Sequence, residues 1–155
     1  MKLSENNLLI GLPTSVISHV EQLCEFKEYK QNDLVAAREA ENRSMFFVIS
    51  GTYTVETTIN QDQDLRYADI SANDFFGEIA AIDGLPRSAD VRCRTAGELA
   101  ELEHENFEAL LASEPQVTLR LLKILQIGFD RQIKGYKISR LRHHQQGSFN
   151  KLSDL

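Results

Sequence analysis

Apolar residues recur at helical spacing over the first part of the chain. Steps of three and four residues connect Leu8, Leu9, Leu12, Val16, Ile17, Val20, Leu23 and Cys24, which is the period of an amphipathic helix. Pro13 is tolerated in a first helical turn but disfavours helical geometry at the residue before it. We therefore predict a short helix that breaks near Gly11 and a second helix from about Thr14 to Glu25, both within a helical segment of residues 1–30.

From residue 33 to residue 103 the pattern becomes that of β-strands. Polar and apolar residues alternate over 53–58, which is the period-two pattern of a half-buried strand. Further short strands are predicted at 45–50, 65–70, 89–94 and 99–102, with a polar turn at 60–64. Short strands at this spacing predict a jelly-roll-like β-roll. The fold class is therefore α+β and mainly β, with helices on both sides of the roll.

Helical periodicity returns after residue 105. Phe107, Leu110 and Leu111 predict a short amphipathic helix, and Pro115 suits the start of the next one. A second, long helix is predicted from Val117 to about residue 144, so that residues 105–145 form the C-terminal helical part.

Apolar residues at heptad steps mark one face of this long helix, namely Leu122, Phe129 and Tyr136. A helix of about 28 residues is about 40 Å long, which is more than one small β-roll covers. We therefore favour pairing of this helix with a second copy of the chain, a homodimer, over packing on its own roll alone. Residues 146–155 are polar and are predicted to fray as a tail.

Charge and composition exclude several classes of protein. Residues 1–114 hold nine Lys and Arg against 21 Asp and Glu, a net charge of −12, whereas residues 115–155 hold eight against two. An acidic body argues against a nucleic-acid partner. No apolar run approaches the ~20 residues of a membrane span, and the N-terminus does not resemble a secretory signal. We expect a cytoplasmic protein that does not bind membranes, and we interpret the basic end as a solvated helix, with a local anionic partner left open.

No set of residues in the sequence points to catalysis or to a metal. Cys24 and Cys93 match no redox or metal-ligand spacing, and the four histidines form no recognisable metal set or nucleophile–base pair. We therefore expect a protein that is not an enzyme and that holds no metal.

The residues with the clearest chemical pattern lie between 75 and 91. Gly77 allows a tight turn and a close approach of ligand, and a helix start after it would expose the N–H groups of Ile79 and Ala80 to an anion. Glu78 supplies an acceptor for a hydroxyl. Arg87 can make two parallel bonds to a phosphate. Ser88 adds a hydroxyl donor and Ala89 leaves room, so the segment predicts a sugar phosphate or nucleotide as ligand.

This segment resembles the phosphate-binding cassette of cyclic nucleotide-binding domains, a family that includes the Crp/Fnr-like regulators and the regulatory subunits of protein kinase A. The family pattern stands here as Phe76-Gly77-Glu78-Ile79-Ala80 and then Pro86-Arg87-Ser88-Ala89, followed by Val91. The segment 46–51 is also similar to a strand of the family. The resemblance covers about residues 8–142, so we predict one cyclic nucleotide-binding domain over residues 1–145.

The resemblance implies a role for each residue of the cassette. Glu78 would accept a hydrogen bond from the ribose 2′-hydroxyl, and Arg87 would pair with the cyclic phosphate. Ser88 and the N–H groups of Ile79 and Ala80 would complete the phosphate cradle, while Gly77 would keep the approach open. Ser88 fits either base, so the regulatory ligand would be cAMP or cGMP.

The predicted function is that of a sensor that signals through movement of its C-terminal helix, either to a downstream protein partner or to a further domain. The sequence shows no helix-turn-helix after the long helix, so we expect no DNA binding by this chain. One alternative is a ligand-independent interaction or oligomerisation module of the same fold. Another is a sensor of a different small anion in the same pocket.

Overall fold

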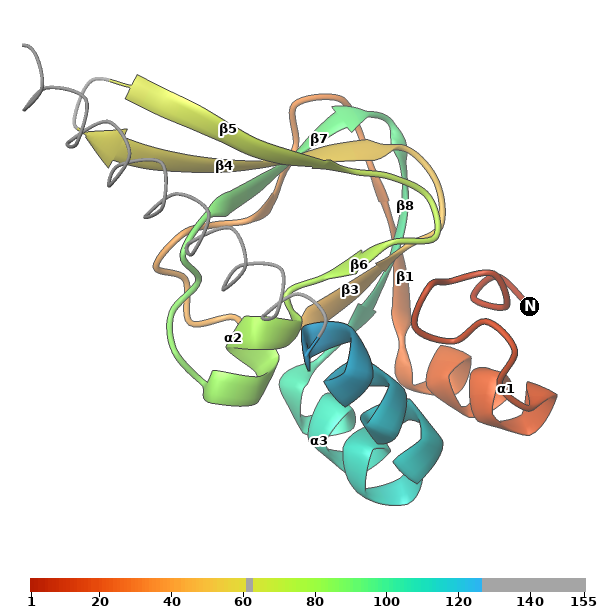
Figure 1. Cartoon of the computed structure of the whole chain (residues 1–155). Coiled ribbons are helices and arrows are strands. Elements are labelled where there is room, and N and C mark those ends of the chain that lie inside the picture. Colours follow the sequence, from red (N-terminus) through yellow and green to blue (C-terminus); the bar gives the residue numbers. More distant parts are fainter. Residues whose placement is uncertain (61–62, 127–155) are drawn as a thin grey trace, which may run out of the picture. The chain divides into compact units, whose positions relative to one another are not determined.

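The fold of the first 117 residues is a β-roll bounded by helices. The computed structural model describes residues 1–60 and 63–126 (Figure 1). It divides the chain into two compact units, Met1–Val117 and Thr118–Leu155. The first unit contains two four-stranded antiparallel sheets and the helices α1 (Thr14–Leu23), α2 (Glu78–Asp83) and α3 (His104–Ser113). Residues 115–126 are helical.

The first sheet has the order β1-β8-β3-β6. Its strands are β1 (Glu25–Tyr29), β8 (Gly97–Leu102), β3 (Met45–Val48) and β6 (Phe75–Phe76). All four residues of β3 are buried. One face of the strand contributes Phe46 and Val48 to the core between the sheets, and α3 lies on the other side of this sheet (Figure 1). A strand buried on both faces is a continuous apolar run rather than an alternation, and the run Met-Phe-Phe-Val has that form.

The second sheet has the order β2-β7-β4-β5. Its strands are β2 (Leu34–Ala36), β7 (Asp90–Thr95), β4 (Thr52–Asn60) and β5 (Gln63–Ile70). The core lies between the two sheets, and both sheets contribute to it, with Phe46, Val48 and Leu99 from the first and Tyr53, Val91 and Cys93 from the second. The helix α2 lies at one open end of the roll, between β6 and β7 in sequence (Figure 1).

The structure confirms the predicted β-roll and most of its elements. The helix expected from about Thr14 ends at Leu23, and the strands expected at 45–50, 53–58, 65–70, 89–94 and 99–102 are present with shifted ends. The short helix around Phe107 is α3. Three strands were not predicted as such, namely β1, β2 and β6. The helix start expected after Gly77 is that of the six-residue α2.

Two predictions for the N-terminal helical segment are wrong. Residues 7–12 form turns rather than a helix, because the Asn6 side chain bonds the backbone: its Oδ1 accepts from the N–H of Leu8 at 3.0 Å, and its Nδ2 donates to the carbonyl of Asp74 at 2.9 Å. Such side-chain bonds compete with helical ones. Residues 25–29 belong to β1, because their backbone pairs with β8 over the whole strand.

The outer part of the predicted long helix, its dimer contact and the polar tail at 146–155 lie outside the described residues. Among residues 1–60 and 63–126, no helix has the length and the apolar character needed to span a membrane.

Candidate functional site

A cavity of about 410 Å³ opens beside α2, within the size range of roughly 300–1,000 Å³ that is typical of small-molecule sites. Twelve of its thirteen lining residues lie between Phe76 and Val91. The remaining one, Val55 of β4, pairs with Val91 of β7 and adds an apolar side chain. The segment that forms the wall begins on β6, passes through α2 and ends on β7. The cavity is thus enclosed where the chain crosses from one sheet to the other.

Gly77 is required by the backbone at the start of α2. Its φ is +85°, a conformation that favours glycine. A Cβ added there would lie 2.7 Å from the carbonyl oxygen of Ser44 and 3.0 Å from Nη1 of Arg87. The absence of a side chain therefore lets α2 approach both the end of the β2–β3 loop and the guanidinium. The first N–H groups of a helix have no partner within it, and those of α2 belong to residues that line the cavity.

Arg87 is anchored across the roll although its backbone precedes β7. The residue is only 7% exposed. Its Nη2 donates to the carbonyl oxygen of Ser44 at 2.5 Å and, at 3.4 Å, to Oδ1 of Asn42. The guanidinium carbon lies 5.5 Å from the centre of the Phe46 ring. Nε is buried without a hydrogen-bond partner in the described part of the chain, which leaves one donor of a cation at the cavity wall unused.

Burial acts in opposite directions on the two charged groups of the cavity. It raises the pKa of Glu78 and lowers the pKa of Arg87, and in each case the attraction between the two groups opposes the effect of burial. Burial therefore disfavours the charged form of both side chains, because each has lost contact with water. A ligand that donates to the carboxylate and accepts from the guanidinium would compensate both.

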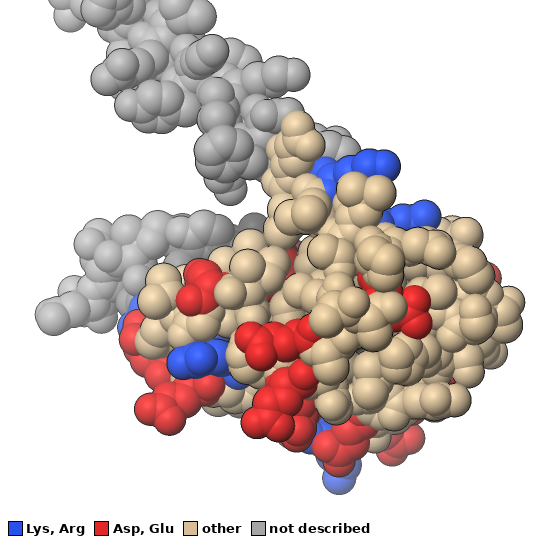
Figure 2. Space-filling model, turned by 90° about the horizontal axis from the view of Figure 1, so that it is seen from below, with Lys and Arg blue, Asp and Glu red and all other residues tan. Residues whose placement is uncertain are grey.

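The rest of the body does not attract anions. Figure 2 shows more Asp and Glu than Lys and Arg on the face of the molecule that it presents, in agreement with the net charge of −12 over residues 1–114. An anion that binds here depends on local donors rather than on long-range attraction. Asp90 lies next to the cavity wall, and its Oδ1 accepts a hydrogen bond from the backbone N–H of Arg38 at 2.6 Å.

All seven residues singled out from the sequence line this one cavity, namely Gly77, Glu78, Ile79, Ala80, Arg87, Ser88 and Ala89. Six further lining residues were not singled out, namely Val55, Phe76, Asp83, Leu85, Pro86 and Val91. Five of these six belong to the segment 75–91. Val55 comes from a distant strand, and its only signal in the sequence was its place in the period-two alternation of 53–58. Within the described residues, no group of three or more His, Cys, Asp or Glu side chains could hold a metal ion.

Comparison with solved structures supports the fold. The catabolite activator protein of Thermus thermophilus superposes with a TM-score of 0.79 at 21% identity, covering 84% of this chain and 62% of that one. This level of identity carries information on the fold alone.

Comparison of sequences gives relatives of two kinds. The cAMP-activated global transcriptional regulator CRP of Salmonella typhimurium is 24% identical over 99 residues, which is 63% of this chain and 47% of the regulator. A cyclic nucleotide-gated potassium channel of Rhizobium etli is 35% identical over 79 residues, which is 51% of this chain and 21% of the channel. The chain spans less than half the length of either relative.

The profile of the family described as "Cyclic nucleotide-binding domain" matches residues 26–114. This range contains the strands of the roll except the first residue of β1, together with α2 and the whole cavity wall, and it makes up more than half of the chain. The chain belongs to the cyclic nucleotide-binding domain family.

Proposed function

We propose that this chain is a regulatory module that binds cAMP or cGMP in the cavity beside α2. The observation that carries the proposal is the arrangement of Arg87: a buried cation at the cavity wall with an unused Nε–H, across from a desolvated carboxylate. One cation and one carboxylate in the same small cavity match a ligand that carries both an anion and hydroxyl groups.

Each lining group has a place in this proposal. Arg87 pairs with the cyclic phosphate, and Glu78 accepts from the ribose 2′-hydroxyl. The N–H groups of Ile79 and Ala80 and the Ser88 hydroxyl complete the phosphate cradle, while Gly77 and Ala89 leave room for it. Val55 and Leu85 offer apolar surface to the flat base.

The proposed output is a shift in the position of the C-terminal helix. Ligand favours whichever arrangement of the helix beyond Val117 is compatible with the occupied cavity. The division of the chain into two compact units falls directly after this residue, which is where such a movement would begin. We further propose that the helix pairs with a second copy of the chain and that the signal passes to a downstream protein partner. The proposed location is the cytoplasm, and the proposed role is binding rather than catalysis.

Calorimetric titration of the nucleotide-free protein with cAMP and with cGMP tests the binding. Arg87→Ala is the matched variant. A hydrogen bond from a charged donor contributes about 1.5–3 kcal/mol, so the variant should bind about 10- to 100-fold more weakly. The nucleotide with the higher affinity identifies the signal. Absence of heat and of any thermal shift with either nucleotide, for folded protein, would favour the ligand-independent interaction module instead.

A distance measurement tests the output. Spin labels on an exposed residue of α3 and of the helix at 115–126 should report a changed distance distribution when the nucleotide saturates the protein, and sedimentation should report the oligomeric state. An unchanged distribution and an unchanged assembly would refute signalling through the helix while leaving nucleotide binding in place.

A further inference from the structure

A buried carboxylate on β8 lies close to the binding cavity without lining it. Glu101 pairs with Phe46 of β3, as Leu99 pairs with Val48. Directly paired residues of antiparallel strands share one face of the sheet, so Glu101 lies on the same inner face as these core residues. It is only 7% exposed. A charged side chain in such a position is costly unless it is paired and hydrogen-bonded.

Three side chains satisfy Glu101. Lys27 Nζ donates to its Oε2 at 2.6 Å, and Asn42 Nδ2 donates to its Oε1 at 3.4 Å. The side chain of Ser44 also bonds to it. Burial alone would raise the pKa of Glu101, but the bonds from Lys27, Ser44 and Asn42 outweigh burial and lower it. Glu101 is therefore an anion at neutral pH.

Two of these three partners also hold Arg87. The Oδ1 atom of Asn42 and the carbonyl oxygen of Ser44 are the acceptors for Arg87 Nη2. The attraction of Glu101 is the largest of the influences that oppose the effect of burial on the Arg87 cation, and it exceeds that of Glu78. The Asn42 side chain is itself fixed, because its Oδ1 also accepts from the N–H of Ser44 at 2.7 Å.

We propose that Glu101 is a positioning residue for ligand binding: through Asn42 and Ser44 it directs acceptor atoms at Arg87 and so holds the guanidinium at the cavity wall. This inference rests on the proposed function, because the guanidinium is the group that would meet the phosphate. Glu101 itself does not line the cavity. It acts on ligand only through the residues between.

The polarity of the hydrogen bonds makes the inference testable. All three partners of Glu101 donate to it, as an ionised carboxylate with two acceptor oxygens allows. In Glu101→Gln, one oxygen becomes an NH₂ group. If the remaining oxygen stays with Lys27, the NH₂ group faces the donors of Asn42 and Ser44. Asn42 can accept a hydrogen bond from this new NH₂ group only if its own side-chain amide turns over. The Asn42 NH₂ group would then lie against Arg87, where its oxygen now accepts.

We expect Glu101→Gln to bind cAMP and cGMP about three- to thirty-fold more weakly than the unsubstituted protein, as is typical for coupled polar groups. An alternative effect has the opposite sign, because an anion near the cavity also repels phosphate. Unchanged or tighter binding by Glu101→Gln would therefore overturn the inference.

A double-mutant cycle separates positioning from a general effect on the fold. In the Arg87→Ala background, Glu101→Gln should cost little further affinity, because the group that it positions is already gone. A loss of affinity of the same size in both backgrounds would show that Glu101 acts independently of Arg87, and it would refute the proposal.

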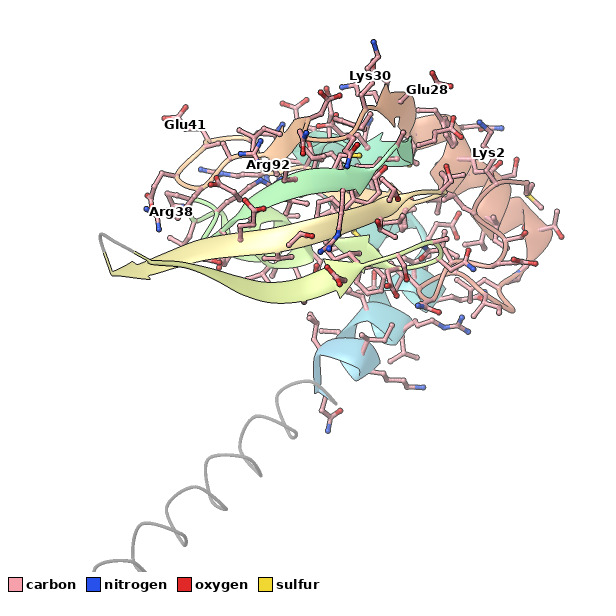
Figure 3. All side chains as sticks on the ribbon, turned by 90° about the horizontal axis from the view of Figure 1, so that it is seen from above. Lys2, Glu28, Lys30, Arg38, Glu41 and Arg92 are labelled. Atoms are coloured by element: carbon pink, nitrogen blue, oxygen red, sulfur yellow. The ribbon has the colours of Figure 1, made fainter. Side chains whose placement is uncertain are left out.

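Two further variants complete the experiment. Glu98→Gln is the matched control on the same strand: Glu98 pairs with Lys2 at 2.6 Å, and Figure 3 shows Lys2 far from Arg38 and Glu41, whose loop carries Asn42. Its affinity should not change. If Glu101→Gln does not fold, Asn42→Ala, at an exposed residue, should reproduce the loss of affinity, and normal affinity in that variant would refute the proposal.

The same titrations distinguish a failure of nucleotide binding from a failure of the positioning role of Glu101. If the unsubstituted protein binds neither nucleotide, the proposed function fails and this inference fails with it. If the unsubstituted protein binds and Arg87→Ala does not, but Glu101→Gln binds normally, only the positioning role is refuted.

Discussion

Arg87→Ala should destabilise the protein in the absence of any ligand. The side chain connects two parts of the roll, because its backbone leads into β7 of the second sheet whereas its guanidinium is bonded to Ser44, directly before β3 of the first. The substitution removes that connection and leaves a buried carbonyl oxygen without its donor.

The magnitude follows from the contacts that are lost. A hydrogen bond from a charged donor contributes about 1.5–3 kcal/mol, and a cation over an aromatic ring contributes about 1–2 kcal/mol. The bond to Asn42 at 3.4 Å is longer and adds less to stability than the bond to Ser44, although it helps to orient the guanidinium. Part of this loss is offset, because the alanine variant no longer buries a cation whose charged form is disfavoured by desolvation. We expect a net loss of about 1–3 kcal/mol, which corresponds to a fall in melting temperature of about 2–12 °C.

Urea unfolding followed by far-ultraviolet circular dichroism measures this loss, and the chain has no tryptophan to follow instead. Arg94→Ala, on the strand β7 that follows Arg87, is the control. Arg94 is exposed and its ion pair with Asp69 spans 3.8 Å, so its loss should change the free energy of unfolding by less than about 0.5 kcal/mol. An Arg87→Ala protein that is as stable as the unsubstituted one, or more stable, would refute the assignment of a structural role to the guanidinium.

Three further substitutions test other parts of the site. Gly77→Ala should lower the free energy of unfolding by about 2–4 kcal/mol, because a Cβ would lie 2.7 Å from a backbone oxygen; Gly11→Ala, which has a similar φ but open space around it, should cost only about 1 kcal/mol, and equal losses in urea unfolding would contradict the steric argument. Burial raises the pKa of Glu78, so the unliganded protein loses stability as the pH rises from the unfolded to the folded pKa of this group. Glu78→Gln should therefore unfold at a higher urea concentration than the unsubstituted protein at pH 7, but not at pH 3. The same variant should bind nucleotide more weakly. The pKa of Glu101 is lowered, so its contribution to stability is present above its unfolded pKa and is lost as the pH falls through its folded pKa. Lys27→Met should accordingly lower the free energy of unfolding by about 1 kcal/mol at pH 7 and by much less at pH 2. An equal loss at both pH values would exclude the ion pair as the cause.

The β-roll could be predicted from the sequence because its longer strands have a clear pattern. The run at 45–48 is apolar on both faces, and the strand at 52–60 alternates. The cassette was found because its residues are close together in sequence: all seven predicted site residues lie between Gly77 and Ala89, in the short helix α2, directly before it or directly before β7. The resemblance to a known family supplied the order and spacing that the single residues lack.

The parts that were missed depend on contacts between distant segments. The short strands β2 and β6 have three and two residues, too few to show a period, and they exist through pairing with β7 and β3. The role of Glu101 was missed for the same reason. Its signal was an acidic residue on the inner face of a strand that otherwise contributes Leu99 to the core, and only the structure shows which donors surround it.

The brevity of β6 has a consequence for how the cavity opens. Only two residue pairs, Phe46 with Phe76 and Phe47 with Phe75, attach the start of the cassette to its sheet, whereas the strand after the cassette lies between β2 and β4. Local opening of an edge of two pairs costs less free energy than opening of an internal strand. Amide hydrogens of residues 75–80 should therefore exchange with solvent faster than those of residues 91–95, and a ligand that joins Glu78 to Arg87 would slow exchange chiefly in the first group.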